Sequence, residues 1–224
     1  MISSDTWTLL AESFWKILLP GLKMTIPLTV LSFGLALVIS ILVALIQFAN
    51  VPVLKQISRF YIWIIRGTPL LVQLYVVFFG LPSVGVMIEA FPAAVLVLGI
   101  NEGAYCAETM RSALEAVPSG QMEAGYCSGL NYVQIMRHVV LPQAFRTAVP
   151  PLFNSLISMV KNTSLAANIT VVEMFMATQR IVGRTYRAMP LYLEVAFIYL
   201  IFSTVLTWLQ RYFEKRLNAY GGLR

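Results

Sequence analysis

The sequence predicts an all-α integral membrane protein with about five transmembrane helices. Of its 224 residues, 58% are hydrophobic and only 12% are charged, and the mean hydropathy is +0.77. A soluble domain carries roughly 25% charged residues, so this chain has too few to cover a water-exposed surface. Uncharged stretches longer than the roughly 20 residues that cross a bilayer core support the same conclusion.

Five segments are expected to cross the membrane. Residues 24–54 carry no charge, and residues 61–88 carry only Arg66, with Gly80, Pro82 and Gly85 breaking the far end. The other three segments each contain at least one ionisable residue, and they are 93–116, 139–160 and 190–209. Because such groups are costly in lipid, they are expected to face a bundle interior or a water-filled path.

The distribution of basic residues predicts the orientation. Five spans place the two ends of the chain on opposite sides of the membrane. With the C-terminus in the cytoplasm and the N-terminus outside, ten of the sixteen lysines and arginines fall at the inner face. The outer cluster Arg180, Arg184 and Arg187 runs against this rule. The net charge of +6 is interpreted as loops beside anionic lipid rather than as binding of nucleic acid.

The chain is expected to form one transmembrane domain over residues 21–215. An external segment, 1–20, precedes it, and a cytoplasmic tail, 216–224, follows it. Two connections, 116–138 inside and 162–189 outside, are too long to lack structure in a compact protein. Within the second one, the pattern of residues 170–182 predicts a short amphipathic or re-entrant helix.

Polar side chains recur along the third span at helical spacing. Asn101, Tyr105, Glu108 and Ser112 follow one another at steps of 4, 3 and 4, which places them on one face, and Glu102 flanks that face. Two interpretations are open at this point. The stripe is either the wall of a solute path or a seam of hydrogen bonds between packed helices.

The fourth span carries a second stripe of this kind. Its members are spaced by three or four residues, and they are Gln143, Arg146, Pro150, Asn154, Ser158 and Lys161. The pair Pro150–Pro151 is expected to kink or loosen the helix and free backbone carbonyls. Two facing polar stripes are what a translocation path requires, although a polar seam between subunits has the same pattern. We favour the path.

The sequence contains no motif for bond chemistry. It has neither a G-x-x-x-x-G-K-[ST] phosphate loop nor a G-x-S-x-G nucleophile motif, and His138 is its single histidine. Cys106 and Cys127 have neither metal-binding nor disulfide-framework spacing. We therefore expect no catalytic residue, no cofactor and no metal, and the chain cannot hold ATP by a phosphate loop.

The inner connection contains the most specific motif. Glu123-Ala124-Gly125 is followed by Gly129 and, nine residues later, by the sequence Val-Val-Leu-Pro at 139–142. This resembles the E-A-A-x-x-x-G-x9-I-x-L-P loop of permease subunits of ATP-binding-cassette importers, with departures at Gly125 and Val139. Residues 66–70 and 161–166 are similar to polar amino acid permeases. Residues 150–169 are most similar to the cystine permeases of the histidine/glutamine/cystine group.

The resemblance implies a type I importer-like permease fold in a bacterial inner membrane. It implies that the loop at 116–138 forms a short coupling helix that docks on a separate ATPase. The coupling residues it indicates are Glu123, Ala124, Gly129, Leu141 and Pro142. The implied partners are ATP-binding-cassette ATPase subunits, a second permease subunit (identical or a paralogue), an extracellular or periplasmic solute-binding protein, and membrane lipid, with no nucleic acid.

The predicted function is the translocation path for a polar amino acid, with cystine among the candidates. The residues expected to line this path are Asn101, Glu102, Tyr105, Glu108, Asn154, Ser158 and Lys161. Glu108 is expected to face the substrate ammonium, and Lys161 or a helix N-terminus its carboxylate. Glu102 is expected to tune substrate preference, and residues 66–69 to shape the inner end of the second span. The alternative is a non-transporting scaffold whose stripes serve only subunit packing.

Overall fold

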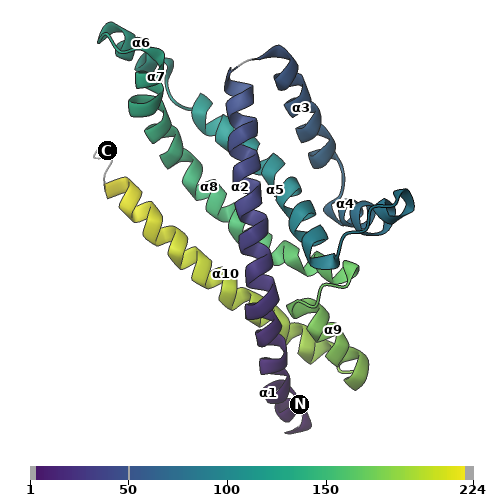
Figure 1. Cartoon of the computed structure of the whole chain (residues 1–224). Coiled ribbons are helices and arrows are strands. Elements are labelled where there is room, and N and C mark those ends of the chain that lie inside the picture. Colours follow the sequence, from purple (N-terminus) through teal and green to yellow (C-terminus); the bar gives the residue numbers. More distant parts are fainter. Residues whose placement is uncertain (1–3, 50, 220–224) are drawn as a thin grey trace.

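The computed structural model describes residues 4–49 and 51–219, and every regular element in this part of the chain is a helix. The predicted all-α class is therefore confirmed. Figure 1 shows long helices running between two ends of the molecule. The N-terminal helix α1 (Ser4–Pro20) and α9 (Met174–Thr185) lie at one end. The short helices α6 (Ser119–Cys127) and α7 (Tyr132–Ile135) lie at the other.

The first span is longer at its start than the uncharged run suggested. Helix α1 continues through a π-helical turn, Gly21–Thr25, into α2 (Ile26–Ala49), and together they form an apolar segment over Asp5–Phe48. The described part of the expected external segment is thus continuous with the first span. The span also ends before residue 54, because Pro52 begins the next helix.

The second span is bent rather than continuous, which corrects the expected straight helix over 61–88. Helix α3 (Pro52–Gly67) and the segment beginning with α4 (Leu70–Tyr75) meet at 103°. Thr68 between them is extended, and Pro69 has no N–H with which to continue the α3 hydrogen-bond ladder. A π-helical turn (Val76–Gly80) and a 3₁₀ turn (Leu81–Val84) complete the segment.

Helix α5 (Ala90–Glu115) lies at the centre and packs along α2. Two glycines permit this close approach. A Cβ atom at Gly99 would lie 2.7 Å from Leu35 Cδ2, and one at Gly103 would lie 3.0 Å from Ile39 Cγ2. Small residues at such contacts let helix backbones approach closely in membranes. Helix α8 (Leu141–Asn162) packs between α5 and α10 (Ala188–Ala219).

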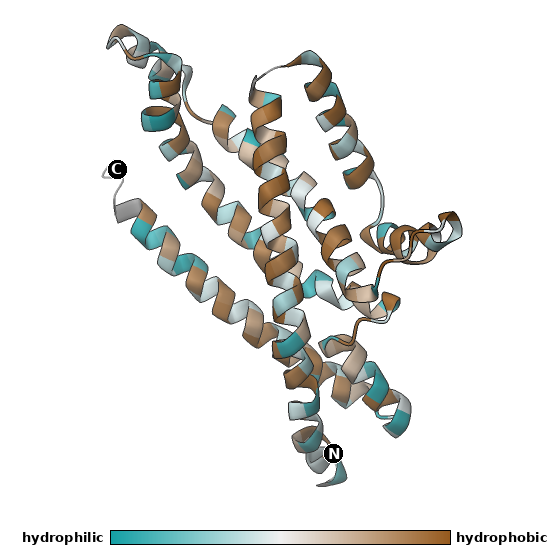
Figure 2. Cartoon of the chain, in the orientation of Figure 1, coloured by the Kyte–Doolittle hydropathy of each residue, from teal (hydrophilic) through white to brown (hydrophobic). Residues whose placement is uncertain are grey.

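Fewer than five helices meet the length and composition of a membrane span. Three described segments do so, namely Asp5–Phe48, Ala90–Glu115 and Ala188–Leu217, and the bent pair raises the number to four. Helix α8 is the exception among the expected five. Its 22 residues are long enough, at about 33 Å, to cross the hydrocarbon core. However, it mixes polar and apolar residues throughout, whereas α2 is apolar over most of its length (Figure 2).

Both long connections are structured, as expected. The first contains α6, α7 and a π-helical turn, Met136–Val140, that leads into α8. The second contains a 3₁₀ segment, Thr163–Ile169, and then α9, so the helix predicted over 170–182 is confirmed with a later start.

A fully buried carboxylate, that of Glu173, starts α9. It accepts hydrogen bonds from the backbone N–H groups of Phe175 (2.9 Å) and Met176 (2.7 Å) and from the Tyr199 hydroxyl of α10 (2.8 Å). Burial raises the pKa of this carboxyl above its ordinary value. The two N–H groups cap α9, and the Tyr199 hydroxyl joins this cap to α10.

Candidate functional site

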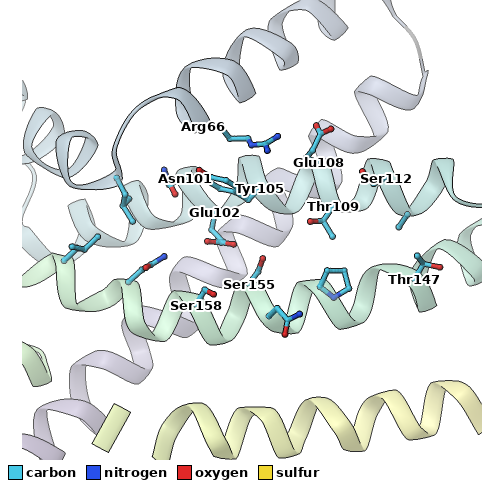
Figure 3. A pocket seen from close by; sticks show the side chains of 16 residues that line it. Arg66, Asn101, Glu102, Tyr105, Glu108, Thr109, Ser112, Thr147, Ser155 and Ser158 are labelled. Carbon is cyan, nitrogen blue, oxygen red and sulfur yellow. The ribbon is translucent and has the colours of Figure 1, made fainter. Parts of the chain in front are cut away.

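A cavity of about 800 Å³ lies between α5 and α8, with the end of α3 and the start of α4 closing one side. Most of the residues that line it have polar or charged side chains, as Figure 3 shows. The polar and charged lining residues are Arg66, Asn101, Glu102, Tyr105, Glu108, Thr109, Ser112, Thr147, Asn154, Ser155, Ser158 and Asn162. The polar stripe of α5 predicted from helical spacing therefore faces this cavity with all four of its members.

The cavity contains six of the seven residues predicted to line a solute path. The seventh, Lys161, is exposed and lines a separate cavity between the end of α8, α9 and α10, together with Tyr192 and Tyr199. Its neighbour Asn162 lines the α5–α8 cavity instead. A lysine at position 161 is thus not placed to meet a solute that occupies the α5–α8 cavity.

The cavity-facing stripe of α8 shares Asn154 and Ser158 with the predicted one and differs in its other members. Its members share one helical face, and they are Thr147, Pro151, Asn154, Ser155, Ser158 and Asn162. Pro150 is turned to the other side, where its carbonyl accepts a 3.5 Å hydrogen bond from Gln210 of α10. Helix α8 carries polar residues on two adjacent faces. The packing of α10 against one of them leaves the other to line the cavity.

The two carboxylates of α5 have different environments. Glu108 is half-buried and forms an ion pair with Arg111, which also contacts Glu115. Glu102 is only 7% exposed, and no ion pair involves it among residues 4–49 and 51–219. Its neighbour across the cavity is the Ser155 hydroxyl of α8 (Figure 3). A buried carboxylate without a cation is costly, so Glu102 is a strong candidate to bind a positively charged group.

Arg66, which we had expected only to shape the end of the second span, belongs to the cavity wall. The bend after Gly67 brings it over α5, where its guanidinium carbon lies 5.2 Å from the centre of the Tyr105 ring. This stacking holds the cation at the cavity edge. The sequence marked Arg66 as the single charged residue in an otherwise apolar span. It did not predict the bend that directs Arg66 toward the cavity.

The loop at 116–138 places its motif residues in two groups. Glu123 and Ala124 of α6 are exposed, as are Leu141 and Pro142 at the start of α8. Gly129 follows α6 with a φ of +78°, which a glycine adopts without strain. The exposed groups are available to a partner, and the turn at Gly129 directs the chain back toward α8.

Gly125, the departure from the usual motif alanine, is buried against the second half of the loop. A Cβ atom at this position would lie 2.7 Å from Ile135 Cγ1 and 2.9 Å from its Cδ1. Glycine has a low helix propensity, but the helix continues past this position to Cys127. The glycine lets α6 pack closely on Ile135, which is itself fully buried in a cluster with Leu114 and Val140.

Comparison with known proteins gives a match over most of the chain. Residues 36–219 match the family described as "Binding-protein-dependent transport system inner membrane component". The chain is 42% identical to the L-cystine transport system permease protein of Bacillus subtilis, over 96% of this chain and 92% of the relative. It is 36% identical to the glutamine transport system permease protein of Escherichia coli K12, over 90% of this chain and 93% of the relative.

Solved structures give the same result for the fold. An amino acid ABC transporter crystallised with histidines superposes with a TM-score of 0.89 at 32% identity, covering 96% of this chain and 99% of that one. The MetNI methionine ABC transporter, in an inward-facing form, superposes with a TM-score of 0.75 at 21% identity, covering 92% and 98% of the two chains. The second likeness concerns the fold alone.

Proposed function

The chain belongs to the binding-protein-dependent transport system inner membrane components, and we propose that its α5–α8 cavity is the path by which an amino acid crosses the membrane. The protein is a permease subunit of an ATP-binding-cassette amino acid importer and is not itself an ATPase. As a multi-pass inner membrane protein of this family, it works with an ATPase and a binding protein.

The observation that carries the proposal is the buried carboxylate of Glu102 beside the cavity of about 800 Å³. An amino acid presents an ammonium and a carboxylate, so its path needs an anionic and a cationic contact. Glu102 supplies the first, in place of Glu108, whose charge Arg111 already compensates. Arg66 supplies the second, in place of Lys161, from the opposite edge of the same cavity.

The scaffold alternative is less well supported by this arrangement. If the polar stripes served only helix packing, their side chains would be expected to meet and hydrogen-bond to each other. Here the stripes of α5 and α8 line an open cavity of about 800 Å³, which is within the range of small-molecule sites. A wall of hydroxyl, amide and charged groups around such a volume suits a polar solute.

We assign coupling to α6, with Glu123 and Ala124 as its exposed contacts to the ATPase. Because α6 and the N-terminus lie at opposite ends of the molecule, this assignment places the N-terminus outside and the C-terminal end of α10 in the cytoplasm. The second half of the pore is a second permease subunit, either an identical copy or a paralogue, and lipid surrounds the apolar outer faces.

Cystine is our preferred substrate among polar amino acids. The relative from Bacillus subtilis is an L-cystine permease protein, and 42% identity over nearly the full length supports a shared substrate. The segment that most resembles cystine permeases, 150–169, contributes six residues to the cavity wall, which are Pro151, Asn154, Ser155, Ser158, Asn162 and Leu165. Residues that contact the solute are where a shared substrate would constrain the sequence.

The test is ATP hydrolysis by the complex reconstituted with its ATPase and binding protein. We expect a polar amino acid, cystine first among them, to stimulate hydrolysis. Glu123→Lys should abolish co-purification of the ATPase, whereas Glu12→Lys, a matched reversal on an exposed residue of α1, should not. Normal coupling in Glu123→Lys would remove the assignment of α6, and no stimulation by any amino acid would remove the substrate class.

A further inference from the structure

The bend between α3 and α4 is held by the side chain of Gln73 in α4. In a continuing helix the carbonyl of Ile65 would accept from the backbone N–H of residue 69, but Pro69 has none. The Gln73 amide nitrogen takes this place, with Nε2 lying 2.8 Å from the Ile65 oxygen. Nε2 also lies 3.2 Å from the Thr68 carbonyl oxygen and 2.8 Å from Thr68 Oγ1.

These three acceptors determine which end of the Gln73 amide faces α3. Backbone carbonyls only accept, and the Thr68 hydroxyl has already given its hydrogen to the Ile64 carbonyl at 2.9 Å. Only the amide nitrogen can donate to these acceptors, and two of them share one of its two hydrogens. The amide oxygen, Oε1, must therefore point away from α3, and there it accepts a 2.9 Å hydrogen bond from Asn101 Nδ2 of α5.

The orientation is thereby passed on to Asn101, which is 6% exposed and lines the α5–α8 cavity. Its Nδ2 is engaged by Gln73, so the atom that it offers to the cavity is the carbonyl oxygen Oδ1. Among residues 4–49 and 51–219, no donor is bonded to Oδ1. An oxygen at this place attracts an ammonium group and disfavours a carboxylate.

We propose that Gln73 is a positioning residue, which orients the Asn101 amide so that the cavity presents an acceptor to the ammonium of the transported amino acid. The inference rests on the proposed function of the cavity and adds to it a residue that does not line the cavity itself. It also makes the helix bend a part of the recognition site, because the broken end of α3 supplies the acceptors that orient Gln73.

The test is equilibrium binding of radiolabelled amino acids, L-cystine included, to the purified permease–ATPase complex without binding protein. The near-isosteric Gln73→Met removes both the amide nitrogen that bonds to the end of α3 and the amide oxygen that accepts from Asn101. For the amino acid that binds the wild-type complex best, we expect roughly tenfold weaker binding, as befits a misdirected hydrogen bond to a charged group. Gln210→Met, a matched change in α10 away from the cavity, should bind like wild type.

A double variant separates positioning from a merely structural role. In Asn101→Asp, both side-chain oxygens are acceptors, so the cavity has its acceptor whatever Gln73 does, and the second oxygen meets Gln73 Oε1 unfavourably. Adding Gln73→Met to Asn101→Asp should therefore leave binding unchanged or improve it. A purely structural Gln73 would give the same tenfold loss in both backgrounds.

The possible outcomes distinguish this inference from the proposed function. If the wild-type complex binds no amino acid, the proposed cavity function fails and the positioning role fails with it. If the wild-type complex binds and Gln73→Met binds equally well, or loses the same factor with and without Asn101→Asp, the positioning role alone is wrong. Loss only in the Asn101 background supports it.

Discussion

The contact between α2 and α5 at Gly99 yields a prediction whose size follows from the structure. A methyl group at Gly99 would lie 2.7 Å from Leu35 Cδ2, 2.9 Å from Leu35 Cγ and 3.0 Å from Leu35 Cβ. The Leu35 Cβ position is fixed by the backbone, so a change of rotamer can move Cγ and Cδ2 but does not relieve the 3.0 Å contact. Overpacking of this kind costs about 1–3 kcal/mol, while alanine gains about 1 kcal/mol over glycine in helix propensity.

Gly34 of α2 is the matched control, because a Cβ atom there meets nothing within 4 Å. The propensity gain is common to both sites and cancels in the comparison. We therefore expect Gly99→Ala to be less stable than Gly34→Ala by about 1–3 kcal/mol. The assay is unfolding of the purified protein by titration with sodium dodecyl sulfate, followed by circular dichroism.

A compensating change sharpens the test. Leu35→Ala removes the two closest atoms and leaves only the 3.0 Å contact with Cβ, so Gly99→Ala should cost less stability in the Leu35→Ala background than in the wild type. If Gly99→Ala unfolds at the same detergent concentration as Gly34→Ala, the close packing of α2 on α5 is wrong. If the cost of Gly99→Ala persists undiminished in the Leu35→Ala background, the clash is not its cause.

Three further predictions concern the coupling loop and α9. Gly129→Ala, at a φ of +78°, should destabilise the coupling loop by about 1 kcal/mol, seen as faster hydrogen exchange over α6, while Gly120→Ala in the same helix, where nothing lies within 4 Å, should not. Gly125→Ala should also loosen α6, because its methyl meets Ile135, and unchanged exchange would contradict this packing. Glu173→Ala leaves three partly buried donors without this acceptor and should lower the free energy of unfolding by about 2–4 kcal/mol. The exposed Glu12→Ala should change it by less than about 0.5 kcal/mol, and equal effects of the two would remove the proposed role of Glu173.

The apolar runs of the sequence predicted the helical class, the central span and the last span, because long uncharged stretches have few alternatives to a membrane helix. The bend at Gly67–Leu70 was not predicted from them. Hydropathy does not register the missing N–H of Pro69. The same composition is compatible with one straight helix or with two helices joined at a bend. The bend is what brings Arg66 to the cavity.

Helical spacing predicted the cavity-facing stripe of α5, but in α8 it predicted only Asn154 and Ser158 of the residues that face the cavity. In α5 the polar residues occupy one face, so spacing alone decides. In α8 two neighbouring faces are polar, and the choice between Lys161 and Asn162 depends on how α9 and α10 pack, which the spacing within α8 does not contain. The role of Gln73 was missed for the same reason, since it depends on contacts between three helices.

The central claim is that an amino acid binds in the α5–α8 cavity through Glu102, and one binding measurement tests it. With the permease–ATPase complex lacking binding protein, Glu102→Gln should weaken amino acid binding roughly 10- to 100-fold, the value of a hydrogen bond between charged groups. Glu194→Gln is the control, because it changes a glutamate of α10 that is bonded to Ser13 outside the cavity, and it should alter binding less than about twofold. Equal affinities of Glu102→Gln and wild type would contradict the claim.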